Sequence, residues 1–248
     1  MKTTSLGFLA ILSILLPLHS QEAPVVQTTL SFAIWYDGVN LRPLIRQEEP
    51  ISGLDLYVLN QEKVYELSAP FGHFGRTLNY QGSKTVPLYD RPPNPSQVSR
   101  PVALIQLEEA TGENAVLLFP DLSQDTIRYQ AKTFDSSLNA FPRGSLCVAN
   151  FFSTTLYLKI GENPVRIDAH QTKTIRVTDQ LNRGISLLAV VKEDGSNRTL
   201  PLIQRRIRMN PEDRLYLFIA PHPTKPRGAT LRIMNAPKTA PEGNLSVF

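Results

Sequence analysis

The amino-acid sequence predicts an all-β protein, and three observations lead to this prediction. From Thr28 onward, apolar and polar residues alternate in segments of five to eight residues, which is the period of a strand with one buried face. Turn signals rich in Gly, Asn, Asp and Pro separate these segments every ~8–12 residues, as in sandwiches and barrels. No window sustains the apolar spacing of an amphipathic helix for three turns, and only Asp135–Phe141 could form a short helix.

The first half of the chain contains seven of the expected strands. One hairpin is expected where 54–59 and 64–67 flank a turn, and a second where 103–107 and 115–119 flank a Gly-containing loop. Pro87 cannot donate a ladder hydrogen bond, so its strand is expected at a sheet edge. The seven segments are 30–36, 54–59, 64–67, 85–89, 103–107, 115–119 and 127–131.

The second half contains eight further expected strands. Turn signals separate them at 161–164, 182–184, 193–197 and 210–213. The last of these turns predicts a hairpin that brings Arg214 across from the preceding strand. The eight segments are 146–152, 155–160, 165–167, 174–177, 186–192, 200–207, 214–219 and 230–234.

A faint internal repeat favours two copies of one β-domain. The repeated pairs are Leu56–Tyr57 with Leu156–Tyr157, Leu104–Gln106 with Leu202–Gln204, Leu118–Phe119 with Leu217–Phe218, and Thr85–Asp90 with Thr174–Asp179. The shared order of these pairs predicts one domain over residues 21–140 and another over 141–248. One large sandwich is the alternative.

Part of the first half resembles uncharacterised tandem immunoglobulin-like domains of bacterial exported proteins. The resemblance rests on Leu54–Leu59, on Ser68–Gly72 with its Pro-Phe-Gly sequence, and on Tyr80–Gly82 before the next strand. It covers about forty residues and implies two tandem immunoglobulin-like β-sandwiches. The second half lacks the Phe-Gly element, and the resemblance brings no catalytic residue with it.

Residues 1–20 have the layout of a secretory signal peptide. Lys2 supplies a positive start, Leu6–Leu18 carries no charge, and the small Ser20 precedes polar residues. A spanning helix needs ~20 apolar residues, so an uncleaved anchor is the alternative. Because no later stretch is long enough to span a membrane, we expect the mature chain to be exported, to the bacterial periplasm or outside the cell.

The cysteine and histidine content argues against a cofactor or metal. Cys147 is the only cysteine, which excludes an intramolecular disulfide and a Cys-based zinc or iron–sulfur site. It lies in an apolar run, so we expect a small buried side chain and not a reactive thiol. The histidines of the mature chain, His73, His170 and His222, are far apart in the sequence and form no metal-ligand pair.

No sequence motif indicates an enzyme. The chain has no nucleophile elbow, Walker loop, dinucleotide fingerprint or HExxH motif. Two carboxylates from distant strands could still converge, so a glycoside hydrolase-type enzyme remains a third hypothesis. Nucleic acid is not an expected partner, because the exported chain lacks interleaved aromatic and basic residues.

The segment Phe71–Arg76 is a candidate binding loop. Phe71 and Phe74 could stack on a sugar or grip a peptide, with His73 and Arg76 as polar partners on a Gly-hinged backbone. The alternative is a crossover between strands whose two rings fill the core.

Charge is divided unequally between the two halves. Residues 21–140 carry 9 Lys and Arg against 14 Asp and Glu, whereas residues 141–248 carry 16 against 8. Arg206 and Arg208 are expected on one face of a strand, with Arg214 nearby, where they could bind phosphate, carboxylate or an anionic glycan. The alternatives are that the acidic half docks on the basic half, or that edge charges discourage aggregation.

The leading hypothesis is a non-enzymatic exported protein of two β-sandwiches, with a structural or interaction role in the envelope. Its partner would be an envelope protein. The second hypothesis is a binding module for an anionic glycan or peptide, acting through the basic half and the loop Phe71–Arg76. The sequence does not indicate an oligomeric state.

Overall fold

The computed structural model of the chain is all-β, as predicted. Its described residues form sixteen strands in four four-stranded sheets, and no helix occurs among them. The expected signal peptide and nearly all of the turns at 182–184 and 193–197 lie outside the described part of the chain. The structure describes residues 25–35, 53–61, 63–94, 99–107, 112–121, 128–177, 184–192 and 199–238.

Strands β1 to β8 build the first sandwich. Its inner sheet has the order β4-β1-β7-β8 and its outer sheet the order β3-β2-β5-β6. The pairing of β1 with β7 is parallel, and the hairpin predicted over 54–67 is confirmed by antiparallel β2 and β3. The strands are β1 Val25–Ile34, β2 Gly53–Asn60, β3 Lys63–Pro70, β4 Leu78–Ser83, β5 Thr85–Tyr89, β6 Ala103–Gln106, β7 Glu113–Asp121 and β8 Arg128–Asp135.

Strands β9 to β16 build the second sandwich. Its inner sheet has the order β12-β9-β15-β16 and its outer sheet the order β11-β10-β13-β14, with β9 and β15 parallel. The strands are β9 Ser145–Asn150, β10 Leu156–Ile160, β11 Asn163–Ile167, β12 Thr172–Arg176, β13 Ile185–Lys192, β14 Thr199–Ile207, β15 Arg214–Pro221 and β16 Ala229–Asn235.

The two sandwiches have the same topology. Adding eight to each strand number of the first sandwich gives both sheets of the second, including the parallel pair. The repeated Leu-Tyr pairs lie in equivalent strands, β2 and β10, and the Leu-Ile-Gln repeats lie in β6 and β14. The pairing of Thr85 with Thr174 is wrong by one strand, because β12 corresponds to β4 and not to β5.

Two predicted hairpins are wrong, and they are equivalent to each other. β6 and β7 lie in different sheets of the first sandwich, and β14 and β15 lie in different sheets of the second. In both sandwiches the chain crosses from the outer to the inner sheet at this point. Alternation shows which residues face a core but not which strands pair, so a crossing between sheets resembles a hairpin in the sequence.

Pro87 lies in an interior strand and not at the predicted edge. β5 is placed between β2 and β6, yet its pairing with β2 covers only Tyr57↔Tyr89 and Val58↔Leu88. Pro87 lies beyond this short ladder, so its missing N–H removes no hydrogen bond to β2.

Two further local differences separate sequence and structure. Asp135–Phe141 forms a single turn and not a short helix, closed by the bond from the Phe141 N–H to the Ser137 carbonyl at 2.8 Å. β4 was missed because only Leu78 and Tyr80 mark its buried face before Gly82, which is too little alternation to identify a strand.

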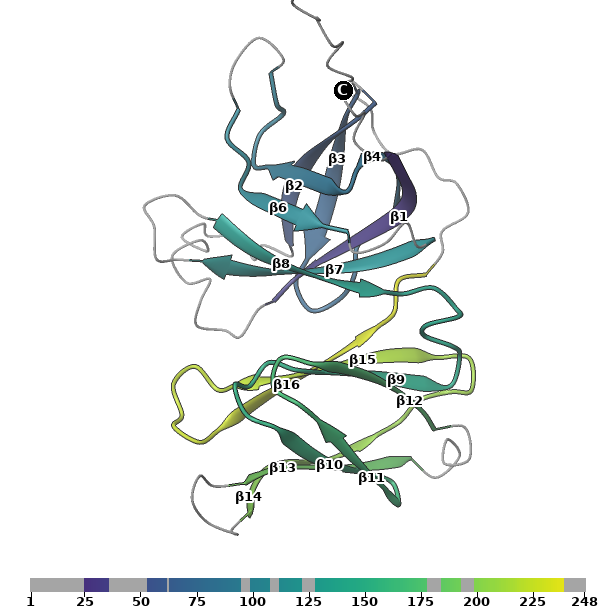
Figure 1. Cartoon of the computed structure of the whole chain (residues 1–248), viewed down its shortest axis with the longest axis vertical. Helices are drawn as coiled ribbons and strands as arrows, with labels where there is room; N and C mark the ends of the chain where they lie inside the picture. The colour runs from purple at the N-terminus through teal and green to yellow at the C-terminus, as the bar shows by residue number, and fades with distance from the viewer. Residues whose placement is uncertain are drawn as a thin grey trace, which may run out of the picture.

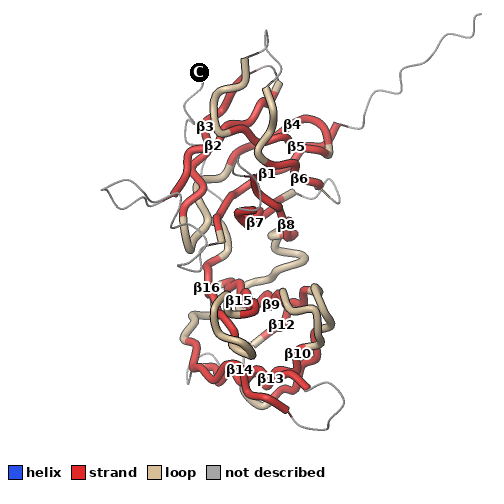
Figure 2. The backbone as a smooth tube through the Cα atoms, turned by 90° about the vertical axis from the view of Figure 1, so that its left-hand side faces the viewer, coloured by secondary structure: helices blue, strands red, loops and turns tan. Residues whose placement is uncertain are grey.

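The four sheets are stacked in layers, with the two inner sheets facing each other (Figures 1 and 2). One hydrophobic core lies inside each sandwich. A third cluster of buried side chains lies between the sandwiches, and we call it the inter-sandwich cluster. It consists of Ala33, Trp35, Ala115, Leu117, Phe134, Phe141, Cys147, Ala149, Tyr216, Phe218, Ala220, Met234 and Ala236.

Each inner sheet is therefore buried on both faces along its central strands. In β15 the odd-numbered residues from Leu215 to Ile219 face the second core, and the even-numbered ones face the first sandwich. Every residue of β9 is buried, as is the stretch from Asn114 to Leu118 in β7. Covering both faces explains the continuous apolar runs in these strands, where a one-sided strand would alternate.

Aromatic rings form most of the contact between the sandwiches. The ring of Trp35 in the first sandwich lies 5.9 Å from that of Phe151 and 6.4 Å from that of Phe218. Phe134 lies 5.4–5.5 Å from both Tyr216 and Phe218, in the tilted geometry that aromatic pairs prefer. Alanines occupy other positions of the same cluster, which leaves room for the rings.

Neighbouring residues of β15 allow a test of this arrangement, because Phe218 faces the first sandwich and Leu217 faces the second core. We expect Phe218→Ala and Leu217→Ala each to lower the free energy of unfolding, by about 3–5 and 2–5 kcal/mol. Under native conditions Phe218→Ala should speed the labelling of Cys147 by more than its loss of stability explains, because the thiol lies in the inter-sandwich cluster, whereas Leu217→Ala should speed it only through its loss of stability. Labelling rates that follow global stability alone in both variants would contradict this placement.

Cys147 is buried, as predicted, and it gives stability a dependence on alkaline pH. Burial raises the pKa of its thiol to about 12, and burial with the nearby Asp90 raises the pKa of Tyr129 to about 12. The unfolded chain ionises these groups at their ordinary values of 9.0 and 10.0, so it releases protons first as the pH rises. Stability should therefore fall between about pH 9 and pH 12.

Cys147→Ala isolates the cysteine contribution. Urea unfolding at about pH 7 and about pH 10.5 should show a smaller loss of stability for this variant than for the wild type, because one ionising group is gone. An equal or larger loss in the variant would contradict the assignment.

Candidate functional site

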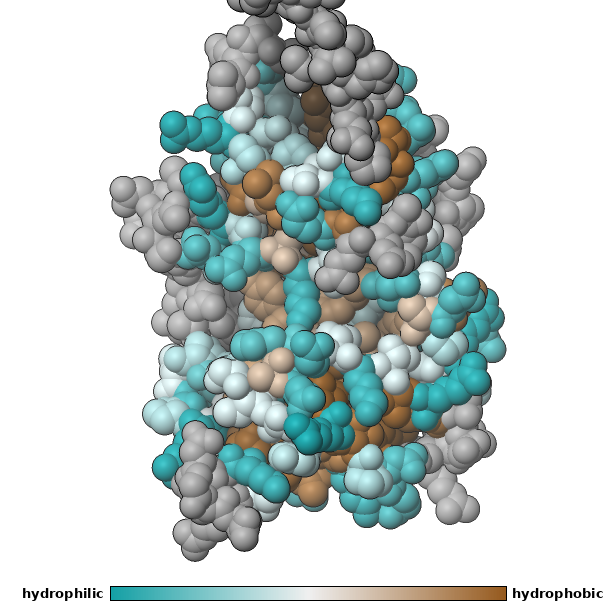
Figure 3. Space-filling model, in the orientation of Figure 1, coloured by the Kyte–Doolittle hydropathy of each residue, from teal (hydrophilic) through white to brown (hydrophobic). Residues whose placement is uncertain are grey.

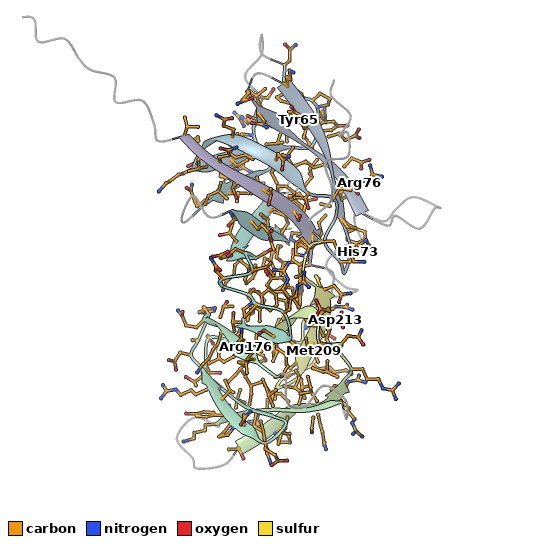
Figure 4. All side chains as sticks on the ribbon, turned by 90° about the vertical axis from the view of Figure 1, so that its right-hand side faces the viewer. Tyr65, His73, Arg76, Arg176, Met209 and Asp213 are labelled. Atoms are coloured by element: carbon orange, nitrogen blue, oxygen red, sulfur yellow. The ribbon has the colours of Figure 1, made fainter. Side chains whose placement is uncertain are left out.

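The rings of the loop Phe71–Arg76 point inward. Phe71 is half-buried against the first core and forms a bridge to Ile34, and Phe74 lies 5.5 Å from the Tyr216 ring of the second sandwich. His73 and Arg76 are exposed on the side of the first sandwich (Figure 4). The loop thus presents one imidazole and one guanidinium to solvent, while its aromatic side chains pack.

Two glycines shape this loop. Gly75 donates its N–H to the Phe32 carbonyl at 2.8 Å, and a Cβ at this position would lie 2.2 Å from the Ser68 carbonyl oxygen. Gly72 has a φ of 77° with open space around it. Gly75 is therefore required by a close backbone approach, and Gly72 by its left-handed conformation.

Arg214 lies at the contact between the sandwiches and not beside Arg206 and Arg208. Its side chain is 10% exposed and 3.8 Å from the Glu113 carboxylate of the first sandwich. The guanidinium donates hydrogen bonds to the carbonyls of Ser136, Phe141 and Pro237. Through these contacts Arg214 of the second sandwich is bound to Glu113 of the first and to the segment 136–141 that joins the two sandwiches. Its strand, β15, lies in a different sheet from β14.

The two arginines of strand β14, Arg205 and Arg206, are exposed, and so is Arg208 directly after its end. Arg206 and Arg208 share the outward side, as predicted, while Ile207 and Met209 are buried in the second core. Arg205 is also exposed, although alternation places it on the inward side; β14 is an edge strand, which lets a long side chain reach solvent. Arg206 lies along Gly184, whose added Cβ would be 3.0 Å from its Nε.

The second sandwich is strongly basic. Its described residues, 141–177, 184–192 and 199–238, include fourteen Lys and Arg but four Asp and Glu. Those acids have local partners: Glu162 pairs with Lys159, Asp168 with Arg166, Glu212 with Arg143, and Asp213 accepts a bond from the Asn210 N–H. Nitrogen-tipped side chains project around this sandwich in Figure 4, and hydrophilic groups cover much of its face in Figure 3.

Docking of an acidic half on a basic half explains little of this excess. Among the described residues, Glu113 with Arg214 is the one ion pair that joins the two sandwiches. The described residues of the first half carry six acids and seven bases, so the acidic excess of residues 21–140 lies outside them. Most of the described basic side chains of the second sandwich are exposed, with Arg214 and Arg232 as the exceptions.

The outward face of the second sandwich's outer sheet carries one cation on each strand. These are Arg166 on β11, Lys159 on β10, Lys192 on β13 and Arg206 on β14. Tyr157 lies half-buried among them, with Arg166 as its cross-strand partner and the Lys192 ammonium 5.2 Å from its ring centre. Hydrogen bonding to Arg166 lowers the pKa of the adjacent Asp168 carboxyl.

A cleft of about 550 Å³ opens at one end of the contact between the two inner sheets, where β1, β7, β9 and β15 end. Trp35 and Phe119 are stacked 5.7 Å apart in its wall, and Phe151 lies 4.9 Å from Phe119 across the contact between sandwiches. The lining residues are Trp35, Phe119, Pro120, Gln130, Ala131, Lys132, Phe151, His170, Ala220, Pro221 and Pro223. The sequence gives no local sign of this cleft, because its lining residues are scattered from Trp35 to Pro223.

Lys132 is the polar centre of the cleft. Its ammonium donates to the His170 carbonyl at 2.9 Å and lies 5.1 Å from the centre of the Phe151 ring. It therefore bridges the two sandwiches and brings a positive charge to an aromatic wall.

Comparisons of the sequence with protein-family models and with curated proteins do not indicate a function. The chain matches no protein-family model and no curated protein sequence. Among the described residues, no group of three or more His, Cys, Asp and Glu could hold a metal ion, and no helix could cross a membrane. The histidines are separate: His73 is exposed, His170 lies in a turn, and His222 accepts hydrogen bonds from the N–H groups of Thr224 and Lys225.

The two loop glycines provide a matched pair of variants. Gly75→Ala should lower the free energy of unfolding by more than 2 kcal/mol, because its methyl group meets backbone, whereas Gly72→Ala should cost about 1–2 kcal/mol from φ alone. Urea unfolding measures both. A larger loss for Gly72→Ala would contradict the close approach at Gly75.

Proposed function

We propose that this protein is a non-enzymatic, exported interaction module of the bacterial envelope that holds an anionic glycan on its second sandwich. The observation that carries the proposal is the excess of fourteen basic over four acidic residues in the described part of that sandwich. The export and envelope part rests on the N-terminal segment. The same proposal treats both sandwiches as immunoglobulin-like. The resemblance over Leu54–Gly82 supports this for the first sandwich, and the shared strand order supports extending it to the second.

The outward face of the outer sheet is the proposed contact surface. Its four cations are distributed one to a strand, and neighbouring strands lie ~4.8 Å apart, so the four strands span roughly 14 Å. The cations are staggered along the strands, because Lys192 pairs with Thr199 whereas Arg206 pairs with Ser186, six residues away on β13. A chain with regularly spaced negative charges can contact several of these cations together, which a single small anion cannot. An extended polymer is therefore the better fit.

The position of Tyr157 favours a sugar polymer. The ring lies between Arg166 and Lys192, so its exposed part has a cation on either side. An aromatic face stacks on the apolar face of a sugar ring, while flanking cations bind the carboxylates of acidic sugars. Leu188 and Val190, half-buried on the same face, extend the apolar strip beside the ring.

Binding of polygalacturonate to the mature chain from Gln21 tests the proposal. We expect the affinity to fall as salt rises, because screening weakens exposed charge pairs. Arg206→Gln with Arg208→Gln should weaken binding about 5–30-fold, at about 0.5–1 kcal/mol for each charge. Tyr157→Ala should weaken it further, through loss of stacking. Calorimetry measures all three effects.

The matched control is Lys63→Gln with Arg76→Gln, which removes two exposed charges from the first sandwich. This control should bind like the wild type. Equal weakening in both double variants would show that net charge acts without a site. If poly-L-glutamate binds as tightly as polygalacturonate, the preference for a glycan is wrong. If neither polymer binds, the proposal is wrong.

A further inference from the structure

We propose that the cleft between the sandwiches is a second binding site, which takes an apolar ring that carries a carboxylate. This site is separate from the basic outer face of the second sandwich and from the function proposed above. The shape of the cleft, its lining and the position of one charge indicate the ligand.

The composition of the wall selects an apolar ligand. Eight of the eleven lining residues are aromatic, Pro or Ala, and the volume of about 550 Å³ lies within the ~300–1,000 Å³ of small-molecule sites. Phe119 and Phe151 are half-buried, so part of each ring faces the cleft. Trp35, at 5% exposure, backs the stacked ring of Phe119. A ring that entered here would continue the tilted and stacked contacts already present.

The polar groups of the cleft select an anion. Lys132 is the sole Lys, Arg, Asp or Glu among the described lining residues, so it is the charge that a bound group meets in this part of the cleft. The Gln130 side chain, exposed on the same strand, adds an amide donor two residues away. A carboxylate next to a ring can therefore lie against Lys132 while the ring lies against Phe119 and Phe151.

This chemistry has two sources, a free aromatic acid or the C-terminal aromatic residue of a polypeptide. Both present a ring and a carboxylate a few bonds apart. Only the peptide also carries a backbone amide, which could donate a hydrogen bond to the Gln130 side chain or accept one from it. The experiment below distinguishes them.

Trp35 makes the test direct, because it is the only tryptophan of the chain. Phenylacetate, titrated into the full mature protein, should change the emission of Trp35 in a saturable way, with a Kd of about 1 mM for so small a molecule. Phenylacetamide has the same ring without the charge, and it should bind about 5–10-fold more weakly. This comparison needs no variant, so it holds even if substitutions in the cleft disturb folding.

Lys132→Met tests the role of the charge. In this variant phenylacetate and phenylacetamide should bind alike, whereas Arg76→Gln, which removes a charge outside the cleft, should keep the wild-type preference. If neither compound alters the emission of Trp35, if both bind the wild type equally, or if Lys132→Met keeps the preference, the proposal is wrong.

The source of the ligand follows from one further comparison. If N-acetyl-alanyl-phenylalanine binds at least 10-fold more tightly than phenylacetate, and more tightly than its own C-terminal amide, the site takes the terminus of a polypeptide. Binding no tighter than phenylacetate would assign it to a free aromatic acid. Both outcomes support the ring and carboxylate chemistry.

Discussion

The burial of both faces of each inner sheet is the constraint on which the rest of the structure depends. One face closes a sandwich core and the other closes the inter-sandwich cluster, so the central strands have no solvent side. Each buried ring there removes about 150–250 Å² from water, or about 4–6 kcal/mol of transfer free energy. The ion pair of Glu113 with Arg214 is worth far less, so the aromatic contact, and not charge, holds the sandwiches together.

The way in which the two sandwiches are held together also affects which charges remain at the surface. Because the contact between sandwiches uses one ion pair among the described residues, most cations of the second sandwich stay exposed, although Lys159 and Arg166 also pair with local carboxylates. The same contact also creates the cleft, since the aromatic wall belongs partly to each sandwich. The basic face needs only the second sandwich, whereas the cleft needs both, so the two candidate sites depend on the fold in different ways.

The sequence predicted local structure well and long-range pairing poorly. Alternation and turn residues located fifteen of the sixteen strands in the described part of the chain, because these signals lie within a few residues of each other. The crossings from β6 to β7 and from β14 to β15 were predicted as hairpins, because pairing between sheets leaves no local mark. Arg206 and Arg208 were correctly placed by alternation. Arg214 was not, since its partners Glu113 and Ser136 are distant in the chain, and the cleft was missed for the same reason.

The duplication argues that the basic face is not a requirement of the fold. Tyr57 and Tyr157 occupy equivalent strands, and each has a charged cross-strand partner on the outer face. In the first sandwich that partner is Glu66, which accepts a bond from the Tyr57 hydroxyl at 3.4 Å, and in the second it is Arg166. The same architecture therefore accommodates either sign of charge at this position. Since folding is satisfied by a carboxylate in one copy, the cations gathered around Tyr157 in the other need an explanation outside folding, and an anionic partner supplies one.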